Sequence, residues 1–324
     1  MSTPEFYKLI CNLQSKSPFK EWWNSERFKH VLIFVIGAIQ FFKCIIFLKH
    51  FNKANFMPNG KVIIYWDYEL QIGADVSQIG YKDGIEDYIQ TEFILKFLKK
   101  ADIKTCFAVV GKAAERGELP YHAPEQIRQM IEEGHEVGSH TYSHRKISRL
   151  TYEELREELV KSKEAIEKIT RKSCTAFVPP WDKPQYFGNL AWDFSNQRIL
   201  PKLSGLSLQQ ICQELKEIGY RTYRICPLLS RFTQLKLSHP FLKEEVLCLP
   251  CRLKNGFGIE AKKLVKKAIE KKGLAVVYGH PGGLAREGEQ SKVNFIDFIH
   301  YLAKERENNR LEIITPKELL LEKY

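Results

Sequence analysis

Short apolar runs alternate with stretches of helical periodicity from about residue 61 to the end of the chain. Such runs are typical of buried parallel strands, and apolar residues recurring every three to four positions are typical of the helices that cover them. Strands are predicted at residues 62–66, 105–110, in the run ending at 137, and at 174–178, 222–225, 246–249, 274–278 and 311–314. Helices are predicted near 85–101, 124–133, 151–168, 208–217, 259–271 and 294–306.

Three helix starts carry capping boxes, in which a Ser or Thr and a Glu or Gln three residues later satisfy each other's backbone N–H groups. They are Thr151 with Glu154, Ser207 with Gln210, and Thr315 with Glu318. Seven- or eightfold alternation of strand and helix within roughly 260 residues favours a β/α barrel over a smaller open sheet. The pattern therefore predicts an α/β fold in which residues 61–324 form one barrel domain.

The first 60 residues are different in kind. Residues 31–48 form an eighteen-residue apolar run broken only by Gln40 and Lys43, about 27 Å as a helix and close to the thickness of a bilayer core. Lys43 inside a bilayer costs about 3 kcal/mol, which favours an interfacial or protein-packed helix instead. A spanning helix and an interfacial helix both remain open, and either would make this N-terminal apolar helical extension membrane-associated; the third alternative is a helix that covers the globular domain.

Composition argues against one class of function, nucleic-acid binding. The 324-residue chain has a net charge of +11, and residues 1–61 contribute nine Lys and Arg against three Asp and Glu. The rest is therefore only weakly basic and lacks a nucleic-acid motif, so no nucleic-acid partner is predicted. Eight cysteines at irregular spacing are expected to be free thiols, including the Cys248 and Cys251 pair.

Polar residues that can carry chemistry gather where predicted strands end. The segment 134–144 contains His140 and His144, whose HxxxH spacing projects both imidazoles from one face if the segment is helical. Other strand ends carry Asp67-Tyr68-Glu69, Pro179-Pro180-Trp181-Asp182, and His280 in a Gly/Pro turn. In a β/α barrel the carboxyl-terminal strand ends form the active-site face, so we expect these four clusters to meet there.

These residue types together predict metal-assisted hydrolysis of an amide or ester. Two histidines and a carboxylate, with an open fourth position for water, form a catalytic zinc ligand set. Metal-bound water has a pKa of about 7, so a second carboxylate can deprotonate it near neutral pH. His280, arriving from another strand, is predicted to protonate the leaving amine.

From about residue 61 to 317 the chain resembles the polysaccharide deacetylases of carbohydrate esterase family four. The resemblance runs through TCFAVVG, HAPEQIRQMIEEGHEVGSHTYSH, the Pro-Pro-Trp turn, YGHPGG and IITPKEL. It implies a distorted (β/α)7–8 barrel and a divalent metal that is usually zinc. It also implies hydrolytic removal of an acetyl or similar small acyl group, such as formyl, from an amino sugar or glycan.

The matching motifs imply a role for each site residue. His140 and His144 are implied metal ligands, and His280 is the implied catalytic histidine. The sequence WDYE fits a branch of the family with Asp-x-Glu, which makes Asp67 the base and Glu69 the third ligand. Substrate binding is predicted for Tyr68, Pro180 and Trp181, with Trp181 and Tyr68 offering an apolar face to a sugar ring; His135 matches a structural position.

The chain also departs from the family pattern. Many members carry two adjacent aspartates at the first strand end, whereas the second position here is Tyr68. The third motif commonly has an arginine, thought to orient the base, before the proline pair, and Val178 stands there instead. The aspartate-tryptophan fourth motif has no counterpart unless Trp192 and Asp193 serve.

Two other functions remain open at the level of sequence. Some relatives of this barrel hydrolyse cyclic amides without a metal, and a barrel that lost the orienting arginine can persist as a non-catalytic glycan-binding protein. Bound metal and acyl release separate these alternatives from a deacetylase. A glycan or lipid-linked sugar substrate, with the membrane surface as a partner, accords best with the N-terminal apolar helix.

Overall fold

The computed structural model of the protein describes residues 59–72, 78–193, 202–228 and 236–323. The chain separates into two compact units, Met1–Asn55 and Phe56–Tyr324, and the described residues belong to the second. The apolar run at 31–48 lies outside them, and so does nearly all of the predicted segment 1–60. Within the described part of the chain, no helix is both long and apolar enough to cross a bilayer.

Strands and helices alternate along the second unit. The strands are β1 (Gly60–Tyr68), β2 (Cys106–Val109), β3 (Glu136–Ser139), β4 (Ala176–Phe177), β5 (Gln185–Phe187), β6 (Leu190–Asp193), β7 (Lys202–Leu203), β8 (Thr222–Pro227), β9 (Phe241–Lys243), β10 (Val246–Pro250), β11 (Leu274–Gly279) and β12 (Leu311–Ile313). The α-helices are α4 (Gln78–Lys100), α5 (Pro124–Glu132), α6 (Tyr152–Thr170), α7 (Leu208–Ile218), α8 (Ile259–Lys271), α9 (Lys292–Glu307) and α10 (Pro316–Lys323).

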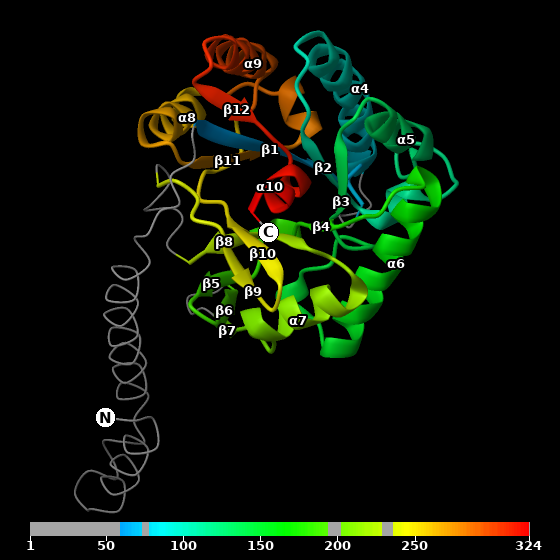
Figure 1. Ribbon diagram of the computed structural model, residues 1–324. Helices are drawn as coiled ribbons and strands as arrows, with labels where there is room; N and C mark the ends of the chain where they lie inside the picture. The colour runs from blue at the N-terminus through cyan, green and yellow to red at the C-terminus, as the bar shows by residue number, and fades with distance from the viewer. Residues whose placement is uncertain (1–58, 73–77, 194–201, 229–235, 324) are drawn as a thin grey trace, which may run out of the picture. The chain divides into compact units, whose positions relative to one another are not determined.

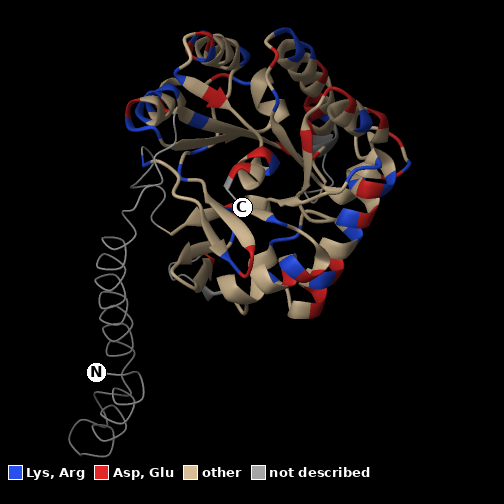
Figure 2. Cartoon of the chain, viewed as in Figure 1, with Lys and Arg blue, Asp and Glu red and all other residues tan. Residues whose placement is uncertain are grey.

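Seven parallel strands form a curled sheet in the order β10-β8-β4-β3-β2-β1-β11. Helices α4 to α9 surround these strands (Figure 1), and Lys, Arg, Asp and Glu lie mainly on the helices while the strands are mostly free of them (Figure 2). Lys61, at the start of β1, donates a hydrogen bond to Glu322 of α10 at 3.0 Å, so α10 lies by the amino-terminal strand ends. The predicted distorted (β/α)7–8 barrel is confirmed.

The barrel is distorted because it stays open between β10 and β11. Among the described residues no backbone ladder joins these two strands, and Cys251, just past β10, donates from its Sγ to the Val276 carbonyl of β11 at 3.7 Å. The outer edge of β10 pairs with β9, and Ser238 forms an antiparallel bridge with Leu274 of β11. Residues 238–243 therefore contact both strands that border this opening, which we call the seam.

Side chains on β1 alternate between the inside and the outside of the barrel, because successive side chains of a strand point to opposite faces. Tyr65 belongs to the interior cluster. Trp66 packs outside, with its ring centroid 5.3 Å from that of Phe295 on α9. The same alternation carries Asp67 to the interior and Tyr68 to the outer, helix-covered side.

The predicted capping boxes agree with the structure, whereas the shortest strands differ from the prediction. The capping boxes that begin α6 and α7 form as predicted, and the one before α10 does too. The predicted strand at 174–178 shrinks to the two residues of β4. The small sheet of β5, β6 and β7 was not predicted, because two to four residues are too few for alternation to be visible.

His135 lies between α5 and β3 and is structural in its contacts. It is 4% exposed, its Nδ1 accepts the Thr105 N–H at 3.1 Å, and its ring meets Phe107 edge-on. Burial, together with the charge of nearby Lys104, lowers the pKa of His135 to about 4. The neutral imidazole is therefore the form that the fold accommodates.

This predicts a pH-dependent loss of stability. Because the folded pKa of His135 lies below its ordinary value of 6.5, the unfolded chain binds the proton more tightly, and stability present above pH 6.5 is lost as the pH falls toward 4. We expect the free energy of unfolding to fall by about 3 kcal/mol more in the wild type than in His135→Gln over that interval. Urea denaturation at several pH values measures both; parallel curves would contradict the assignment.

Candidate metal centre and catalytic site

The predicted site residues meet at the carboxyl-terminal rim of the barrel. Asp67 lies at the end of β1 with Glu69 directly after it, His140 follows β3, and His280 follows β11. His144 comes from the loop between β3 and the short helix η2 (Ile147–Arg149). Because these strands are parallel, their carboxyl ends share one rim, and the strand-end reasoning located these five residues together.

Glu69, His140 and His144 form a compact group. Glu69 Oε1 lies 3.5 Å from His140 Nε2 and 3.2 Å from His144 Nε2. His140 Nδ1 is 2.9 Å from the Val178 carbonyl, which makes it the protonated nitrogen and leaves a lone pair on Nε2. Both Nε2 atoms are buried and have no hydrogen-bond partner.

His140 and His144 come together without a helix between them. Residues 140–144 are not helical; His140 continues from β3, and His144 takes a left-handed conformation with φ of 62°. The loop still brings the two imidazole centroids to 5.1 Å. The helical arrangement considered for these two histidines is not the one that forms, because His140 continues directly from β3 and its N–H donates to the Val109 carbonyl.

The donor set fits a divalent cation. One ligand atom from each of Glu69, His140 and His144 lies within 4.8 Å of the others, and two buried imidazole lone pairs beside a carboxylate are stable only around a cation or a proton. Burial raises the pKa of Glu69, but the three imidazoles around it, His144 foremost, outweigh burial and bring the pKa well below its ordinary value. Glu69 is therefore ionised at neutral pH.

His280 approaches the same carboxylate from β11, the strand that pairs directly with β1. Its Nε2 lies 3.4 Å from Glu69 Oε1 and 4.0 Å from Asp67 Oδ2. Burial lowers the pKa of His280, but the hydrogen bond and charge of Glu69 outweigh it and raise the pKa to about 9. The imidazole is thus suited to carry a proton at neutral pH.

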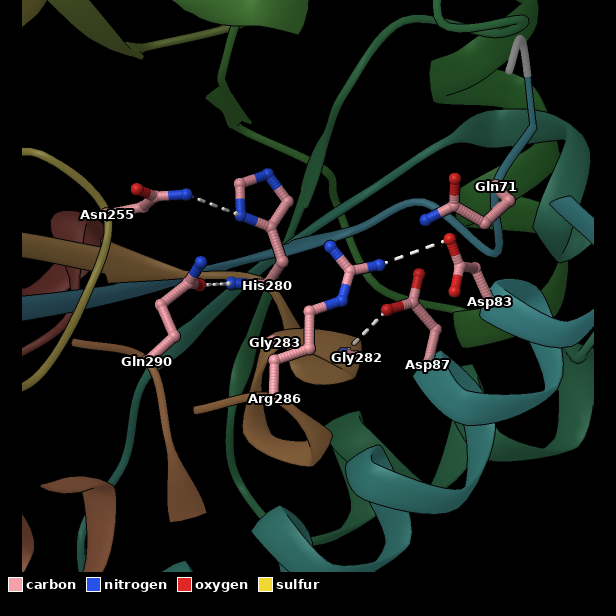
Figure 3. A pocket seen from close by; sticks show the side chains of 9 residues that line it. All are labelled: Gln71, Asp83, Asp87, Asn255, His280, Gly282, Gly283, Arg286 and Gln290. Carbon is pink, nitrogen blue, oxygen red and sulfur yellow. Dashed lines mark hydrogen bonds and ion pairs between the residues drawn. The ribbon is translucent and has the colours of Figure 1, made fainter. Parts of the chain in front are cut away.

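Three side chains fix the turn that carries His280 (Figure 3). Gln290 Oε1 accepts the His280 N–H at 2.7 Å, and Asp87 Oδ1 accepts the Gly282 N–H at 2.6 Å. Asn255 Nδ2 lies 3.4 Å from His280 Nδ1. A Cβ at Gly282 would lie 2.6 Å from Asp87 Oδ1, so this close approach requires glycine.

Asp67 is held by an arginine that the sequence analysis missed. Arg224 of β8 donates from Nη1 to Asp67 Oδ1 at 2.8 Å and from Nη2 to Oδ2 at 2.7 Å. Both side chains are buried, 3% and 1% exposed. Burial raises the pKa of Asp67, but Arg224, followed by His140 and His280, outweighs burial and lowers it.

Arg224 stands where the family pattern does not predict an arginine. Val178, at the position before the proline pair, instead packs in the barrel interior. Arg224 also donates to Asp182 Oδ1 at 3.1 Å, and the Tyr278 hydroxyl donates to Asp182 Oδ2 at 2.5 Å. The one available signal was a lone arginine inside the apolar strand TYRICP, since a charge there needs a buried partner.

Asp193, the candidate for the aspartate of the family's fourth motif, has a structural role. Asp193 accepts hydrogen bonds from Ser148 at 3.0 Å and Arg149 at 3.5 Å, so it serves the η2 turn. Asp182, rather than Asp193, is the carboxylate that pairs with Arg224 alongside Asp67.

Trp181 is well placed to meet a ligand, and the other two predicted substrate contacts are not. Trp181 is 51% exposed in a left-handed conformation, its ring lies 5.3 Å from that of His144, and Lys146 Nζ lies 4.5 Å above it. Tyr68 is fully buried on the outer side of β1, where its hydroxyl donates to Gln126. Pro180 is buried as well. The prediction of a sugar-facing Tyr68 was wrong because neighbours on a strand face opposite sides.

Comparison with known proteins finds similarity to polysaccharide deacetylases over part of the chain. The polysaccharide deacetylase family profile matches residues 79–185. Peptidoglycan deacetylase from Helicobacter pylori is 32% identical over 103 residues, covering 32% of this chain and 30% of that protein. Peptidoglycan-N-acetylmuramic acid deacetylase from Bacillus subtilis is 25% identical over 143 residues, covering 44% of this chain and 42% of that protein. Residues 79–185 therefore carry the match to the polysaccharide deacetylase family.

These matches cover only part of the chain and part of each curated relative. The chain spans less than half the length of both curated relatives, and the matched profile contains His140 and His144 but not Asp67, Glu69 or His280. A solved structure from Mycobacterium smegmatis, described as a candidate polysaccharide deacetylase, superimposes with a TM-score of 0.54 at 14% identity. It covers 82% of this chain and 91% of that one, and supports the barrel fold.

The buried pair predicts a large stability effect. Arg224→Met leaves the Asp67 carboxylate buried without its partner, so we expect the free energy of unfolding to fall by about 3 to 5 kcal/mol. Urea denaturation measures it. Arg128→Met, which removes an exposed arginine paired with Glu125 on α5, is the control and should cost less than about 1 kcal/mol.

A double variant separates pairing from general damage. Asp67→Asn combined with Arg224→Met should cost clearly less than the sum of the two single changes, because each single change already breaks the same pair. Additive losses would show that the two side chains do not depend on each other.

Proposed function

We propose that this protein is a metal-dependent deacetylase that hydrolyses an acetyl, or a related formyl, group from an amino sugar or glycan. The observation that carries the proposal is the meeting of two buried, unpartnered imidazole nitrogens with the Glu69 carboxylate, beside a second carboxylate and a third histidine. The match to the polysaccharide deacetylase family supports a deacylation reaction, and the names of the curated relatives favour a peptidoglycan-type glycan.

Glu69, His140 and His144 would hold the metal, most plausibly zinc given two nitrogen ligands and one oxygen ligand. When bound, the metal acts as a Lewis acid that polarises the acyl carbonyl and lowers the pKa of water to about 7. The three side chains come from β1 and from β3 with its following loop, so the barrel itself sets their spacing.

Asp67 is the proposed base. Arg224 fixes both oxygens of its carboxylate and keeps it ionised, so its orientation does not depend on the substrate. Asp67 takes a proton from water while the water oxygen bonds to the acyl carbon, which gives a tetrahedral intermediate. The low pKa of Asp67 makes it a weak base, matched to a water made more acidic at this site.

His280 is the proposed acid. Its Nε2 lies on the Asp67 side of Glu69, so it reaches the same reacting centre. It donates its proton to the leaving nitrogen or oxygen as the bond from that atom to the acyl carbon breaks. The products are a free amine or alcohol and acetate, and proton donation of this kind contributes about 10² to 10⁴ in rate.

Trp181 is the proposed sugar platform. Its half-exposed indole beside His144 offers an apolar face of the kind that packs on a pyranose ring. The cation of Lys146 lies on the same ring at 4.5 Å, which favours one orientation of the indole.

Metal binding and turnover test the ligand assignment together. His140→Ala and His144→Ala should each lose the roughly one equivalent of metal expected in the wild type and should lose acetyl release, measured by elemental analysis and an acetate assay. His300→Ala, on the exposed side of α9, is the control that should keep both. Unchanged metal content in His140→Ala would refute the ligand role.

We further propose that residues 1–56 attach the enzyme to a membrane bearing a lipid-linked or surface glycan. The apolar run at 31–48 with flanking lysines supports this. The full chain should sediment with lipid vesicles containing anionic lipid, whereas a truncation beginning at Met57 should stay in the supernatant. Equal sedimentation, or equal activity of both forms on membrane-bound substrate, would overturn the proposal.

A further inference from the structure

Helix α8 is the most basic helix in the described part of the chain. It carries five lysines and two glutamates, whereas in each of the other six described α-helices the acidic residues equal or outnumber the basic ones. Lys266 lies 3.9 Å from Glu270 with both side chains more than half exposed, so this pair neutralises little of the charge. Four exposed lysines form what we call the α8 lysine face: Lys263, Lys266, Lys271 and Lys272.

The end of α8 lies beside the point where the chain enters the barrel. A Cβ on Gly60, the first residue of β1, would lie 2.7 Å from the backbone of Ile269 in α8. The next residue, Lys61, donates a hydrogen bond to Glu322 of α10, and the neighbouring Leu321 is 74% exposed. In sequence, β1 follows the segment for which membrane attachment is proposed above. The attachment point of that segment, the end of α8 and an exposed leucine therefore share one end of the barrel.

The catalytic rim is at the opposite end of the barrel. Asp67 lies seven residues after Gly60 along β1, which is about 23 Å at about 3.3 Å per residue. Helix α8 begins after β10, on the rim side, and ends at Lys271, just before β11 starts beside the first residues of β1. A surface that contacts the end of α8 therefore meets the side of the barrel away from the candidate metal group.

An anionic lipid bilayer is the partner that fits this end of the barrel. Lysines close to an anionic lipid surface each add to the attraction, and an exposed leucine can enter the boundary between headgroups and acyl chains. A few lysines alone bind lipid weakly, but a membrane-attached segment keeps them at a high local concentration beside the lipid. The α8 lysine face is thus suited to orient an attached barrel, and a truncation beginning at Met57 is still expected to stay in solution.

We propose that the α8 lysine face rests on an anionic bilayer and turns the catalytic rim away from the lipid. The inference rests on the proposed membrane attachment and deacylation, and it narrows the substrate that they leave open. A sugar joined directly to a lipid lies at the level of the headgroups, whereas the rim is held about 20 Å further out. The substrate class is therefore a glycan chain that extends from the surface, and a sugar joined directly to the lipid is out of reach.

Lysine labelling on vesicles tests this orientation. The full chain is bound to vesicles of phosphatidylcholine with phosphatidylserine, or of phosphatidylcholine alone, and treated with an amine-acetylating reagent, and each lysine is quantified by mass spectrometry. Labelling of Lys266 and Lys271 should fall about tenfold on the anionic vesicles relative to the neutral ones, because the lipid charge holds them at the surface. Lys112 and Lys254, exposed lysines at the catalytic rim, should keep their reactivity on both.

Charge reversal supplies the matched control. Lys266→Glu with Lys271→Glu should return Lys263 on anionic vesicles to its reactivity on neutral ones. Lys112→Glu with Lys254→Glu, the same change in charge at the rim, should leave Lys263 protected.

The outcomes separate the orientation from the proposals on which it rests. Protection of the rim lysines overturns the orientation, and so does equal reactivity of all these lysines on a chain that sediments with anionic vesicles; both leave the attachment standing. A chain that sediments with neither vesicle overturns both. Acetate release is not part of the readout, so a failure of the proposed deacylation would be seen separately, in the acetate assay.

Discussion

Asp67 and Arg224 face each other inside the barrel, and neither charge is stable there without the other. An unpaired carboxylate at this depth would take up a proton and lose its use as a base, and an unpaired guanidinium would carry the full cost of desolvation. Arg224 is also enclosed by aromatic rings, with its guanidinium carbon 4.3 Å from the Tyr278 centroid and 5.3 Å from that of Tyr65. The Asp67 carboxylate is therefore oriented by the packed core rather than by a loop.

In the family pattern the arginine that orients the base precedes the proline pair, whereas here the arginine comes from β8. Both positions can place a guanidinium at the same point. The usual position, before the proline pair, carries Val178, while the guanidinium comes from β8 and a carboxylate, Asp182, comes from the proline turn. Because the parallel strands end at one rim, an interior position on several of them reaches the same point. What the chemistry requires is a paired, ionised base, and more than one strand can supply the partner.

The sequence predicted the barrel and the meeting of Asp67, Glu69 and three histidines, because strand alternation and strand ends are local patterns. Tyr68 was open to correction from sequence alone, since it neighbours Asp67 on a strand and must face the other way. Arg224 was beyond local reasoning, as its partner is 157 residues away. The non-helical backbone of the HxxxH segment was also beyond local reasoning, because β3, which leads into it, is fixed by pairing with β2.

The seam between β10 and β11 shapes how this barrel resists association with other chains. A closed barrel has no free strand edges, whereas β10 and β11 do not pair with each other in the described part of this chain; β9 pairs with the β10 edge, and Ser238 forms one bridge to the β11 edge. Were residues 238–243 cleaved or displaced, two rows of unpaired backbone groups would become available together. Each could template an added strand from a second molecule, so loss of this stretch would favour association of the protein through its strand edges while the rest of the fold stayed intact.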